Sequence, residues 1–595
     1  MKQGSVTLLH IKTVPSIVAR IPKQDHKTVW HFFILVVSPM MIDYLVLLAA
    51  CFVSTARAFA SQVGPAVVAE KGSRQIQQES DRRLRQKHDL VVFNRLFCGI
   101  PERTRPTPWK SSTELPTDFP AGALLRLGPN MDYPESAKAG FLDGDGMVTC
   151  ITFPPDGKTG TCSFTYVDTR SRQLERLVDK KFQGTLGAVP NSWPMLGSLV
   201  SNMISFRTLQ CQKDTCNTAI GVSGDRILCM MEQCPPCELI VCQDGSVSTV
   251  QTGCLVDEIG IANQPMTGGA ISAHGRTNTN GERIHVSYAA ALPPYLRVDI
   301  FDEGWKLKRS IPVNTPCPTM LHDCAVTDGY VVIFDFPLTL RVSRFLQNTF
   351  PVQYEPSYGA RIGLLPIDSS TDKMLWFDVR PGVVLHAANA FERSGGTVVV
   401  HVLRSEPDMN KSYLEEYTSS FLYEYILDPS SQKVISEGYL NVEEIIEFPT
   451  INDNCVGKPV DHVYCNSVQS IGGPLEVYSM PQVAILLGGI TKLSLKEKSK
   501  GQVLGKYALP HRFYGVSEPS VVPKTSGDGE YVVLVATFVP EGEKNWKDLP
   551  DERLFSRVIV LDGDSMEQVW SCDLPFHVNY GLHSAFVPWD KLKNN

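Results

Sequence analysis

Residues 528–536 read Asp-Gly-Glu-Tyr-Val-Val-Leu-Val-Ala, a turn signal followed by an apolar, β-branched run. Asp-Gly favours a tight turn, and apolar runs of about four to eight residues between turns are typical of β-strands. From about Val91 onward the pattern recurs at residues 284–288, 330–334, 397–401 and 558–561, each beside a glycine-containing turn. These stretches show no sustained helical period. The chain is therefore predicted to consist mainly of short strands.

The length of the chain limits how those strands can be arranged. Its 595 residues exceed the roughly 250–300 at which a single hydrophobic core stops growing. Radial repetition of small sheets into a propeller leaves few exposed sheet edges at this size. We therefore expect an all-β protein, with a β-propeller as its architecture, although the sequence has no strict repeat.

Composition narrows the class of protein further. The chain is 43% hydrophobic and 20% charged, which is typical of a folded globular protein rather than a disordered or polytopic membrane protein. Its 56 basic and 63 acidic residues give a net charge of -7, and no block of like charge is long enough to follow a phosphate backbone. Nucleic acid is not an expected partner.

The N-terminal region has the features of a targeting sequence. An apolar run at residues 30–56 follows a basic stretch and ends at Ala-Arg-Ala, residues 56–58, a small-x-small cleavage pattern. We predict a signal-peptide-like segment over 1–58. The alternative is a retained anchor in a secretory-pathway membrane, because residues 30–56 are long enough to span a bilayer. Pro39 and Asp43 interrupt the run and weaken this alternative.

A second targeting segment follows the first. Residues 59–90 begin with Phe59 and mix basic residues with Ser and Gln, as in a transit peptide or flexible segment. The arrangement resembles the bipartite plastid presequence of algae with secondary plastids, in which a signal peptide is cut just before a phenylalanine. This resemblance implies a plastid protein peripheral to membranes. Residues 91–595 are left as the folded domain.

One stretch has a helical rather than a strand period. Apolar residues recur at i, i+1, i+4, i+5, i+8 and i+9 opposite small and polar ones, which predicts an amphipathic helix. This apolar face packs on the protein core or lies on a membrane surface and admits an apolar substrate. It consists of Met195, Leu196, Leu199, Val200, Met203 and Ile204.

Seven of the sixteen cysteines cluster between Cys211 and Cys254, and Cys234-Pro-Pro-Cys237 forms a C-x-x-C pair. Such a pair can bind zinc or exchange disulfides. A zinc ribbon requires a second close pair, for which Cys211 and Cys216 are a loose candidate. Unreactive buried or loop thiols are the third interpretation. The full set is Cys211, Cys216, Cys229, Cys234, Cys237, Cys242 and Cys254.

Four of the thirteen histidines lie at the ends of strand-like runs, beside small residues or a change from apolar to polar sequence. They are too far apart along the chain to form a local metal knuckle, and they can meet only in a closed fold. A single such histidine is usually a packed or surface residue, so the flanking residues decide whether the set has a function. The four are His274, His322, His386 and His583.

The flanking residues resemble those of the carotenoid cleavage oxygenase family. Similar segments occur in family order over about residues 93–589, although leucine replaces the family's phenylalanine at Leu142, Leu385 and Leu582. These departures leave the metal site intact and alter the expected shape of the cavity. The segments are LRLGPN at 125–130, FLDGDGMV at 141–148, HDCAVTDGY at 322–330, LHAANAFE at 385–392 and YGLH at 580–583.

The resemblance implies a seven-bladed propeller with a helical and loop cap over Fe(II), which the four histidines would bind on the propeller axis. It also implies that Glu232 holds His322, that Glu447 holds His386 and that Glu518 holds His583. Imidazole suits Fe(II), and four neutral ligands leave the ion its full charge and open positions. A carboxylate on the second ring nitrogen fixes the tautomer and orientation of each ligand.

The implied activity is a non-haem iron dioxygenase that splits a conjugated double bond of a carotenoid or apocarotenoid with O2 into two carbonyl products. No organic cofactor is implied, and the expected partners are the substrate, O2 and a membrane surface. Alternatives on the same scaffold are a polyene isomerase or isomerohydrolase and a stilbene-cleaving oxygenase. A non-catalytic propeller that binds a carotenoid or a protein is a further alternative, which has no chemical need for these histidines and glutamates.

The targeting pattern predicts that the mature protein begins at or after Phe59, because the apolar run ends at the cleavage pattern and no folded-domain pattern starts before about Val91. N-terminal sequencing of the native protein tests this expectation. A native N-terminus before Val53 would instead indicate a retained membrane anchor.

Overall fold

The computed structural model describes residues 90–131, 141–179, 213–232, 234–252, 270–288, 293–341, 343–344, 351–368, 373–407, 419–472, 484–541 and 553–594. All of these belong to one unit, Ala69–Asn595. Residues 1–89, which hold the predicted targeting segments, and the predicted apolar face at residues 195–204 lie outside the described residues.

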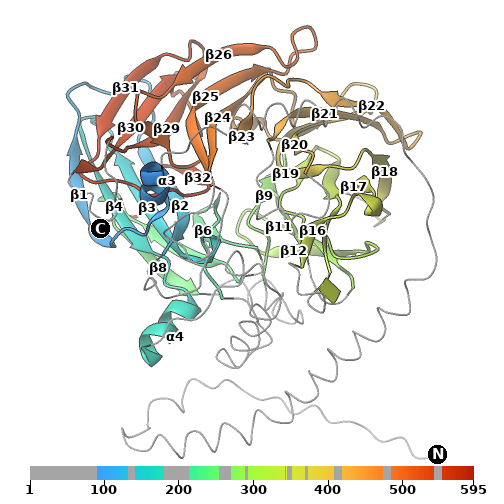
Figure 1. Ribbon diagram of the computed structural model, residues 1–595, viewed down its shortest axis with the longest axis horizontal. Coiled ribbons are helices and arrows are strands. Elements are labelled where there is room, and N and C mark those ends of the chain that lie inside the picture. The colour runs from blue at the N-terminus through green and yellow to red at the C-terminus, as the bar shows by residue number, and fades with distance from the viewer. Residues whose placement is uncertain are drawn as a thin grey trace, which may run out of the picture. The chain divides into compact units, whose positions relative to one another are not determined.

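Most of the described chain forms antiparallel sheets of four strands that follow one another in sequence (Figure 1). The second to the fifth sheet illustrate the pattern. They contain β5 (Ala219–Ser223), β6 (Arg226–Met230), β7 (Cys237–Val241) and β8 (Val247–Thr252); β9 (Gly275–Thr277), β10 (Arg283–Tyr288), β11 (Leu296–Phe301) and β12 (Leu307–Val313); β13 (Ala325–Val326), β14 (Tyr330–Asp335), β17 (Ala360–Pro366) and β18 (Leu375–Val379); and β19 (Val383–Glu392), β20 (Val398–Ser405), β21 (Phe421–Asp428) and β22 (Lys433–Tyr439).

The next sheet has nine strands and comprises two such units joined by β27, which pairs with both β25 and β29. Together with the five-stranded first sheet, the described residues thus form seven such units, as expected for seven blades. The units of the nine-stranded sheet are β23 (Ile446–Thr450), β24 (His462–Gly472), β25 (Ala484–Ser494) and β26 (Val503–Ala508), then, after β27 (Phe513–Gly515), β28 (Ser520–Pro523), β29 (Glu530–Phe538), β30 (Phe555–Asp562) and β31 (Gln568–Asp573).

The first sheet contains strands from both ends of the domain, in the order β1-β4-β3-β2-β32. Figure 1 shows the red end of the chain beside these blue strands. β32 pairs with β2 from Gly122 opposite Pro588 to Arg126 opposite Ser584, so the last strand closes the series of sheets. The strands are β1 (Arg103–Lys110), β2 (Gly122–Asn130), β3 (Asp145–Phe153), β4 (Thr159–Tyr166) and β32 (Ser584–Pro588).

The remaining elements are short. Among the helices of the described residues, none has the length and apolarity needed to cross a bilayer. These remaining elements are the helices α3 (Leu90–Phe97) and α4 (Arg170–Val178), the 3-10 turns η2 (Phe141–Asp143), η4 (Pro356–Tyr358), η5 (Asp453–Cys455) and η8 (Trp589–Lys591), and a two-stranded ribbon of β15 (Leu338–Leu340) and β16 (Val352–Tyr354).

Burial is greatest in strands that lie within a sheet and falls at its outer edge. Every residue of β2 and β3 is buried, whereas β1 and β26 are mostly exposed or half-buried. The first strands of successive units contact one another, β9 with β13, β13 with β19 and β19 with β23, and β32 contacts both β28 and β5. These innermost strands therefore line a common axis, and apolar clusters pack between neighbouring sheets.

A buried arginine lies under the closing strand. Arg126 donates to the carbonyl of Val516 at 3.1 Å and contacts the carbonyl of Asn579, and burial lowers its pKa to about 9. A side chain at Gly581 would meet Arg126, and one at Gly128 would meet the backbone of Gly581. The LRLGPN and YGLH segments thus meet at the closure, and their glycines are needed for this close approach.

Helix α3 supports the segment that leads into β32. The backbone N–H of Tyr580 donates to the carbonyl of Leu96 at 2.5 Å, and the Tyr580 ring stacks on Phe97 with 4.2 Å between ring centroids.

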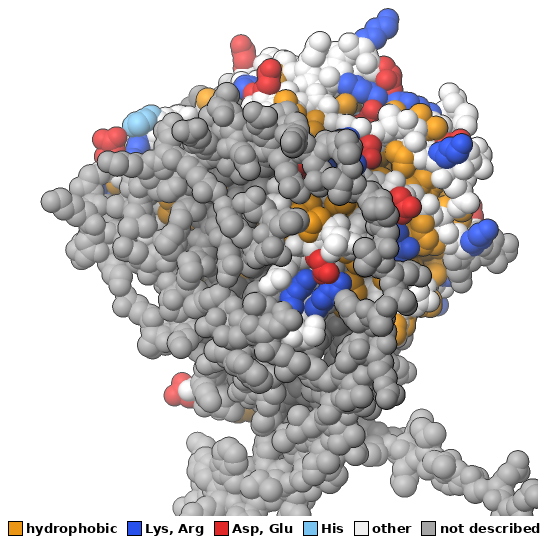
Figure 2. All heavy atoms as spheres, turned by 45° about the vertical axis from the view of Figure 1, so that its right-hand side comes forward, with side chains coloured by type: hydrophobic (Ala, Val, Ile, Leu, Met, Phe, Trp, Pro, Cys, Tyr) orange, Lys and Arg blue, Asp and Glu red, His pale blue; other side chains and the backbone are white. Residues whose placement is uncertain are grey.

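On the described part of the face drawn in Figure 2, acidic and basic side chains are interspersed with hydrophobic ones.

Candidate metal centre

The four predicted histidines come from four different sheets. His274 directly precedes β9, His322 lies three residues before β13, His386 lies within β19, and His583 directly precedes β32. Each of these strands is the innermost of its sheet. Residues far apart in sequence are therefore brought to the common axis by the fold, as the sequence analysis expected.

The four imidazoles converge on one point. Their ligand atoms all lie within 4.8 Å of one another, and Nε2 of His274 lies 3.0 Å from Nε2 of His322. The ring centroids of His274 and His583 are 4.3 Å apart, and those of His386 and His583 are 5.3 Å apart. Within the described residues, this is the group of histidine, cysteine and acidic side chains placed to share a metal ion.

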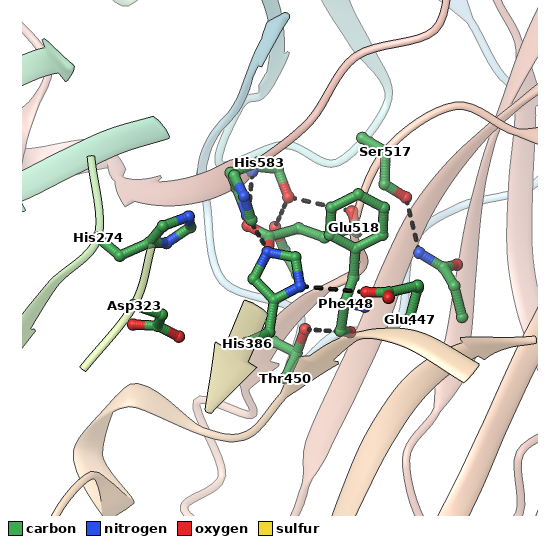
Figure 3. A network of polar contacts seen from close by, with 12 residues as sticks. His274, Asp323, His386, Glu447, Phe448, Thr450, Ser517, Glu518 and His583 are labelled. Atoms are coloured by element: carbon green, nitrogen blue, oxygen red, sulfur yellow. Dashed lines mark hydrogen bonds and ion pairs between the residues drawn. The ribbon is translucent and has the colours of Figure 1, made fainter. Parts of the chain in front are cut away.

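The three predicted glutamates come from the sheets that carry no ligand. Glu232 follows β6, Glu447 lies in β23 and Glu518 precedes β28. Glu447 accepts a hydrogen bond from Nδ1 of His386 at 3.1 Å, and Glu518 accepts one from Nδ1 of His583 at 2.7 Å (Figure 3).

The third pair completes the pattern, because Glu232 Oε1 lies 2.9 Å from Nδ1 of His322. The structure therefore forms the three pairs that the resemblance implied. In each pair the carboxylate occupies Nδ1, which leaves Nε2 of the histidine free to face the common point.

The glutamates are themselves held in place. Glu447 accepts from Ser420 Oγ at 2.8 Å and from the backbone N–H of Phe448 at 3.2 Å. Phe448 has a φ of 53°, an uncommon conformation for a side chain of this size. Its ring lies 5.5 Å from that of His386 and 5.4 Å from that of His583. The strained Phe448 therefore packs against two of the four histidines. Backbone strain of this kind is often found at functional sites.

The electrostatics favour the ionised form of Glu232 and of Glu447. Burial alone would raise the pKa of Glu232 and of Glu447, but the adjacent histidine of each outweighs burial and holds the pKa below its usual value. Burial, followed by the neighbouring histidines, holds the pKa of His274 well below its usual value. Burial also lowers the pKa of His386. His274 and His386 are thus favoured as neutral imidazoles, close to the carboxylates of Glu232 and Glu447.

The pKa of His322 is shifted in the opposite direction from those of His274 and His386. Burial would lower its pKa, but the charge of Glu232 raises it above the usual value. A positive charge is therefore favoured at this part of the centre.

His274 is held through its backbone. Ser272 Oγ donates to the carbonyl of His274 at 3.0 Å, and Nδ1 of His285 donates to the carbonyl of Ser272 at 3.0 Å. A side chain at Gly275 would lie 2.2 Å from the His285 ring. The buried His285 therefore packs directly behind the ligand loop. The sequence analysis had no signal for this role, because the contact depends on the pairing of β9 with β10.

The arrangement fits a divalent metal ion. Nε2 of His386 is buried without a hydrogen-bond partner among the described residues, which is costly unless an ion occupies the site. Imidazole nitrogens lie about 2.0–2.1 Å from a bound zinc ion, so two adjacent ligands on such an ion are about 3 Å apart. The separation of Nε2 in His274 and His322 matches this value.

None of the cysteines in the described residues belongs to this group. Cys237 Sγ lies 3.3 Å from Cys216 Sγ, whereas Cys234 Sγ contacts the sulfur of Met231. Burial raises the pKa of Cys229 and of Cys234 well above the usual value. These features favour unreactive buried thiols over the C-x-x-C chemistry considered above. Cys211 and Cys254 lie outside the described residues.

Comparison with known proteins agrees with this geometry. The model of the family described as retinal pigment epithelial membrane protein matches residues 100–588, which covers the sheets that carry the four histidines and three glutamates. The chain belongs to this family of carotenoid cleavage oxygenases.

Two relatives of the chain are similar to it over most of their length. The carotenoid 9,10(9',10')-cleavage dioxygenase 1 of Pisum sativum is 26% identical over 492 residues, which are 79% of this chain and 85% of the relative. The apocarotenoid-15,15'-oxygenase of Synechocystis is 26% identical over 503 residues, which are 80% of this chain and 93% of the relative.

Solved structures show the same fold. A variant of the Synechocystis apocarotenoid oxygenase matches with a TM-score of 0.66 at 21% identity, over 85% of this oxygenase and 100% of that chain. The cobalt-substituted form of the Synechocystis protein matches with a TM-score of 0.65 at 22% identity, over 84% and 99% of the two chains.

The contacts of the glutamates predict a graded loss of metal binding. His322→Ala removes a ligand and should abolish most of the bound metal. Glu447→Gln should lower the metal affinity by about 10- to 100-fold, the usual effect of losing an orienting partner. Metal titration monitored by calorimetry, with folding checked by circular dichroism, measures both effects.

A matched control is available for the glutamate. Glu424 holds the buried His401 at 3.0 Å, but His401 is not among the converging histidines. Glu424→Gln should leave the metal affinity unchanged. Equal losses in the Glu424 and Glu447 variants would show that Glu447 has no specific role at the metal.

Proposed function

We propose that this protein is an Fe(II)-dependent dioxygenase that cleaves a conjugated double bond of a carotenoid or apocarotenoid. One molecule of O2 is consumed, and each carbon of the broken double bond receives one oxygen atom as a carbonyl. The observation that carries the proposal is the convergence of four histidines within 4.8 Å, three of them backed by glutamates. The names of the relatives in Pisum sativum and Synechocystis agree with this chemistry.

The donor set favours iron as the metal. Imidazole ligands suit Fe(II), and sites of this kind leave positions open for O2 or substrate. Bound Fe(II) would supply the activation of O2, which organic side chains cannot provide. The three glutamates supply negative charge around the dication, because burying an uncompensated charge is costly. Neutral imidazoles alone would leave the full charge of the ion unbalanced.

In this proposal the glutamates orient the metal-binding histidines, and the exposure of the histidines indicates where the substrate approaches. The glutamates fix the tautomer of His322, His386 and His583, so that each presents the lone pair of Nε2. His386 and His583 are buried, whereas His274 and His322 are partly exposed. The centre is therefore accessible from the side of His274 and His322, where we place the approach of the substrate.

The activity test is aerobic incubation of the iron-loaded protein with a panel of carotenoids and apocarotenoids, followed by mass analysis of the products. We expect two carbonyl products per substrate, with both carbonyl oxygens labelled when 18O2 is used. A geometric isomer or an isomerised alcohol would identify an isomerase or isomerohydrolase. Cleavage of stilbenes alone would identify the other scaffold alternative, and bound pigment without turnover would identify a binding protein.

We also propose that the enzyme acts in a plastid at a membrane surface. The support is in the sequence: the presequence-like residues 1–90 and the apolar face at residues 195–204. A carotenoid is almost insoluble in water, so an enzyme that draws it from a bilayer benefits from an apolar surface at the membrane.

The membrane proposal predicts the effect of two charged substitutions. Leu199→Asp with Met203→Asp, in protein lacking residues 1–58, should release the protein from liposomes, because each fully buried apolar side chain contributes about 1.5–3 kcal/mol. Turnover of liposome-embedded pigment should fall more than turnover of detergent-dispersed pigment. Liposome flotation and product analysis measure the two effects.

Exposed apolar residues elsewhere provide the control. Ile435 on β22 and Leu504 on β26 are 58% and 49% exposed, and their replacement by Asp should not affect liposome binding. Unchanged binding of the Leu199 and Met203 variant would mean that the predicted face packs on the protein core.

A further inference from the structure

One charged pair contacts the backbone beside three of the four histidines. Arg276 lies two residues after His274, and Asp323 directly follows His322. The Arg276 guanidinium contacts the Asp323 carboxylate and donates through Nη2 to the carbonyl of Ala387 at 2.9 Å. The arginine thus links the ends of three different sheets.

Asp323 completes the linkage from its own side. Its Oδ2 accepts from the backbone N–H of Ala387 at 2.9 Å, and its Oδ1 accepts from that of Cys324 at 2.7 Å. Nε of Arg276 donates to the carbonyl of Cys324 at 3.0 Å. Because Ala387 directly follows His386, every contact of the pair is made within two residues of a ligand.

The Arg276–Asp323 pair is largely buried, so each charge requires the other as its partner. The Asp323 side chain is 1% exposed and the Arg276 side chain 24%. A buried carboxylate is tolerated when it is paired and its oxygens accept hydrogen bonds, and here both oxygens do. The planar guanidinium can donate to a carboxylate and to two carbonyls together, which the single ammonium group of lysine cannot reproduce.

The need for such a link follows from the architecture. His274, His322 and His386 belong to separate sheets, so no strand pairing joins the segments that carry them. A metal centre requires its ligands within about 0.5 Å of their working geometry. His322 and His386 have glutamate partners, but within the described part of the chain no carboxylate contacts His274.

From these contacts we infer that Arg276 and Asp323 are positioning residues that hold His274, His322 and His386 at the mutual spacing a metal ion requires. The inference rests on the proposed metal-dependent function. It adds a set of contacts between ligand segments to the three histidine–glutamate pairs.

A purely structural salt bridge elsewhere in the fold provides the matched control. Arg361 Nε lies 2.8 Å from Asp335 Oδ2, with the side chains 25% and 0% exposed. This pair has nearly the same burial as Arg276 and Asp323, but it joins β14 and β17 within one sheet. Its loss should affect stability without affecting the metal.

The experiment compares Asp323→Asn and Arg276→Lys with Asp335→Asn in the full chain. Co(II) is the probe, because its visible absorption reports ligand geometry and its titration gives an affinity. We expect Asp323→Asn and Arg276→Lys to weaken Co(II) binding by about 10- to 100-fold and to alter the visible bands. Asp335→Asn should lower the thermal unfolding midpoint of the metal-free protein while keeping the wild-type affinity and spectrum.

Three results would overturn the inference. In the first, Asp323→Asn and Arg276→Lys bind Co(II) with the wild-type affinity and spectrum. In the second, Asp335→Asn weakens binding as much as they do. In the third, the wild-type protein binds no Co(II), which would overturn the proposed metal site together with this inference.

If Asp323→Asn does not fold, the Co(II) affinity and spectrum of Arg276→Lys, which keeps the positive charge, decide between the outcomes.

Discussion

The pairing of β2 with β32 is the constraint on which the metal centre depends. His583 directly precedes β32, so this ligand reaches the axis only when the end of the chain joins the first sheet. Arg126 lies buried beneath the closure, and Gly128 and Gly581 allow the two segments to approach. Closure therefore joins the His583 segment to a sheet whose other strands lie more than 400 residues earlier in the chain.

Each of the seven units contributes one histidine or glutamate of the site. Four innermost strands carry or follow a histidine, and the other three units supply the glutamates. Each of the three carboxylates holds Nδ1 of one histidine and adds negative charge close to the point where the imidazoles converge. The same carboxylates make the centre suitable for a dication and hold Nδ1, so that Nε2 is the atom presented. Charge balance and ligand orientation are thus provided by the same side chains.

Sequence reasoning predicted the all-β class and the positions of many strands, because turn residues and apolar runs act locally. The merging of two units through β27 was not predictable, since it depends on a three-residue strand that pairs on both sides. The four histidines and three glutamates were found through flanking segments similar to those of a known family. The histidines alone would not have been separated from the rest.

Other site residues gave no signal in the sequence. His285 acts through the shape of its ring against Gly275, and Arg276 acts through backbone carbonyls of other sheets. Both roles depend on long-range packing. The predicted apolar face at residues 195–204 and the presequence remain predictions.

The most direct test of the account is an anomalous diffraction map at the iron absorption edge from crystals grown with Fe(II). The account predicts one strong peak per chain, within bonding distance of Nε2 in His274, His322, His386 and His583. A peak bound by Cys216 and Cys237, or no peak among the four histidines in crystals that contain iron, would contradict it.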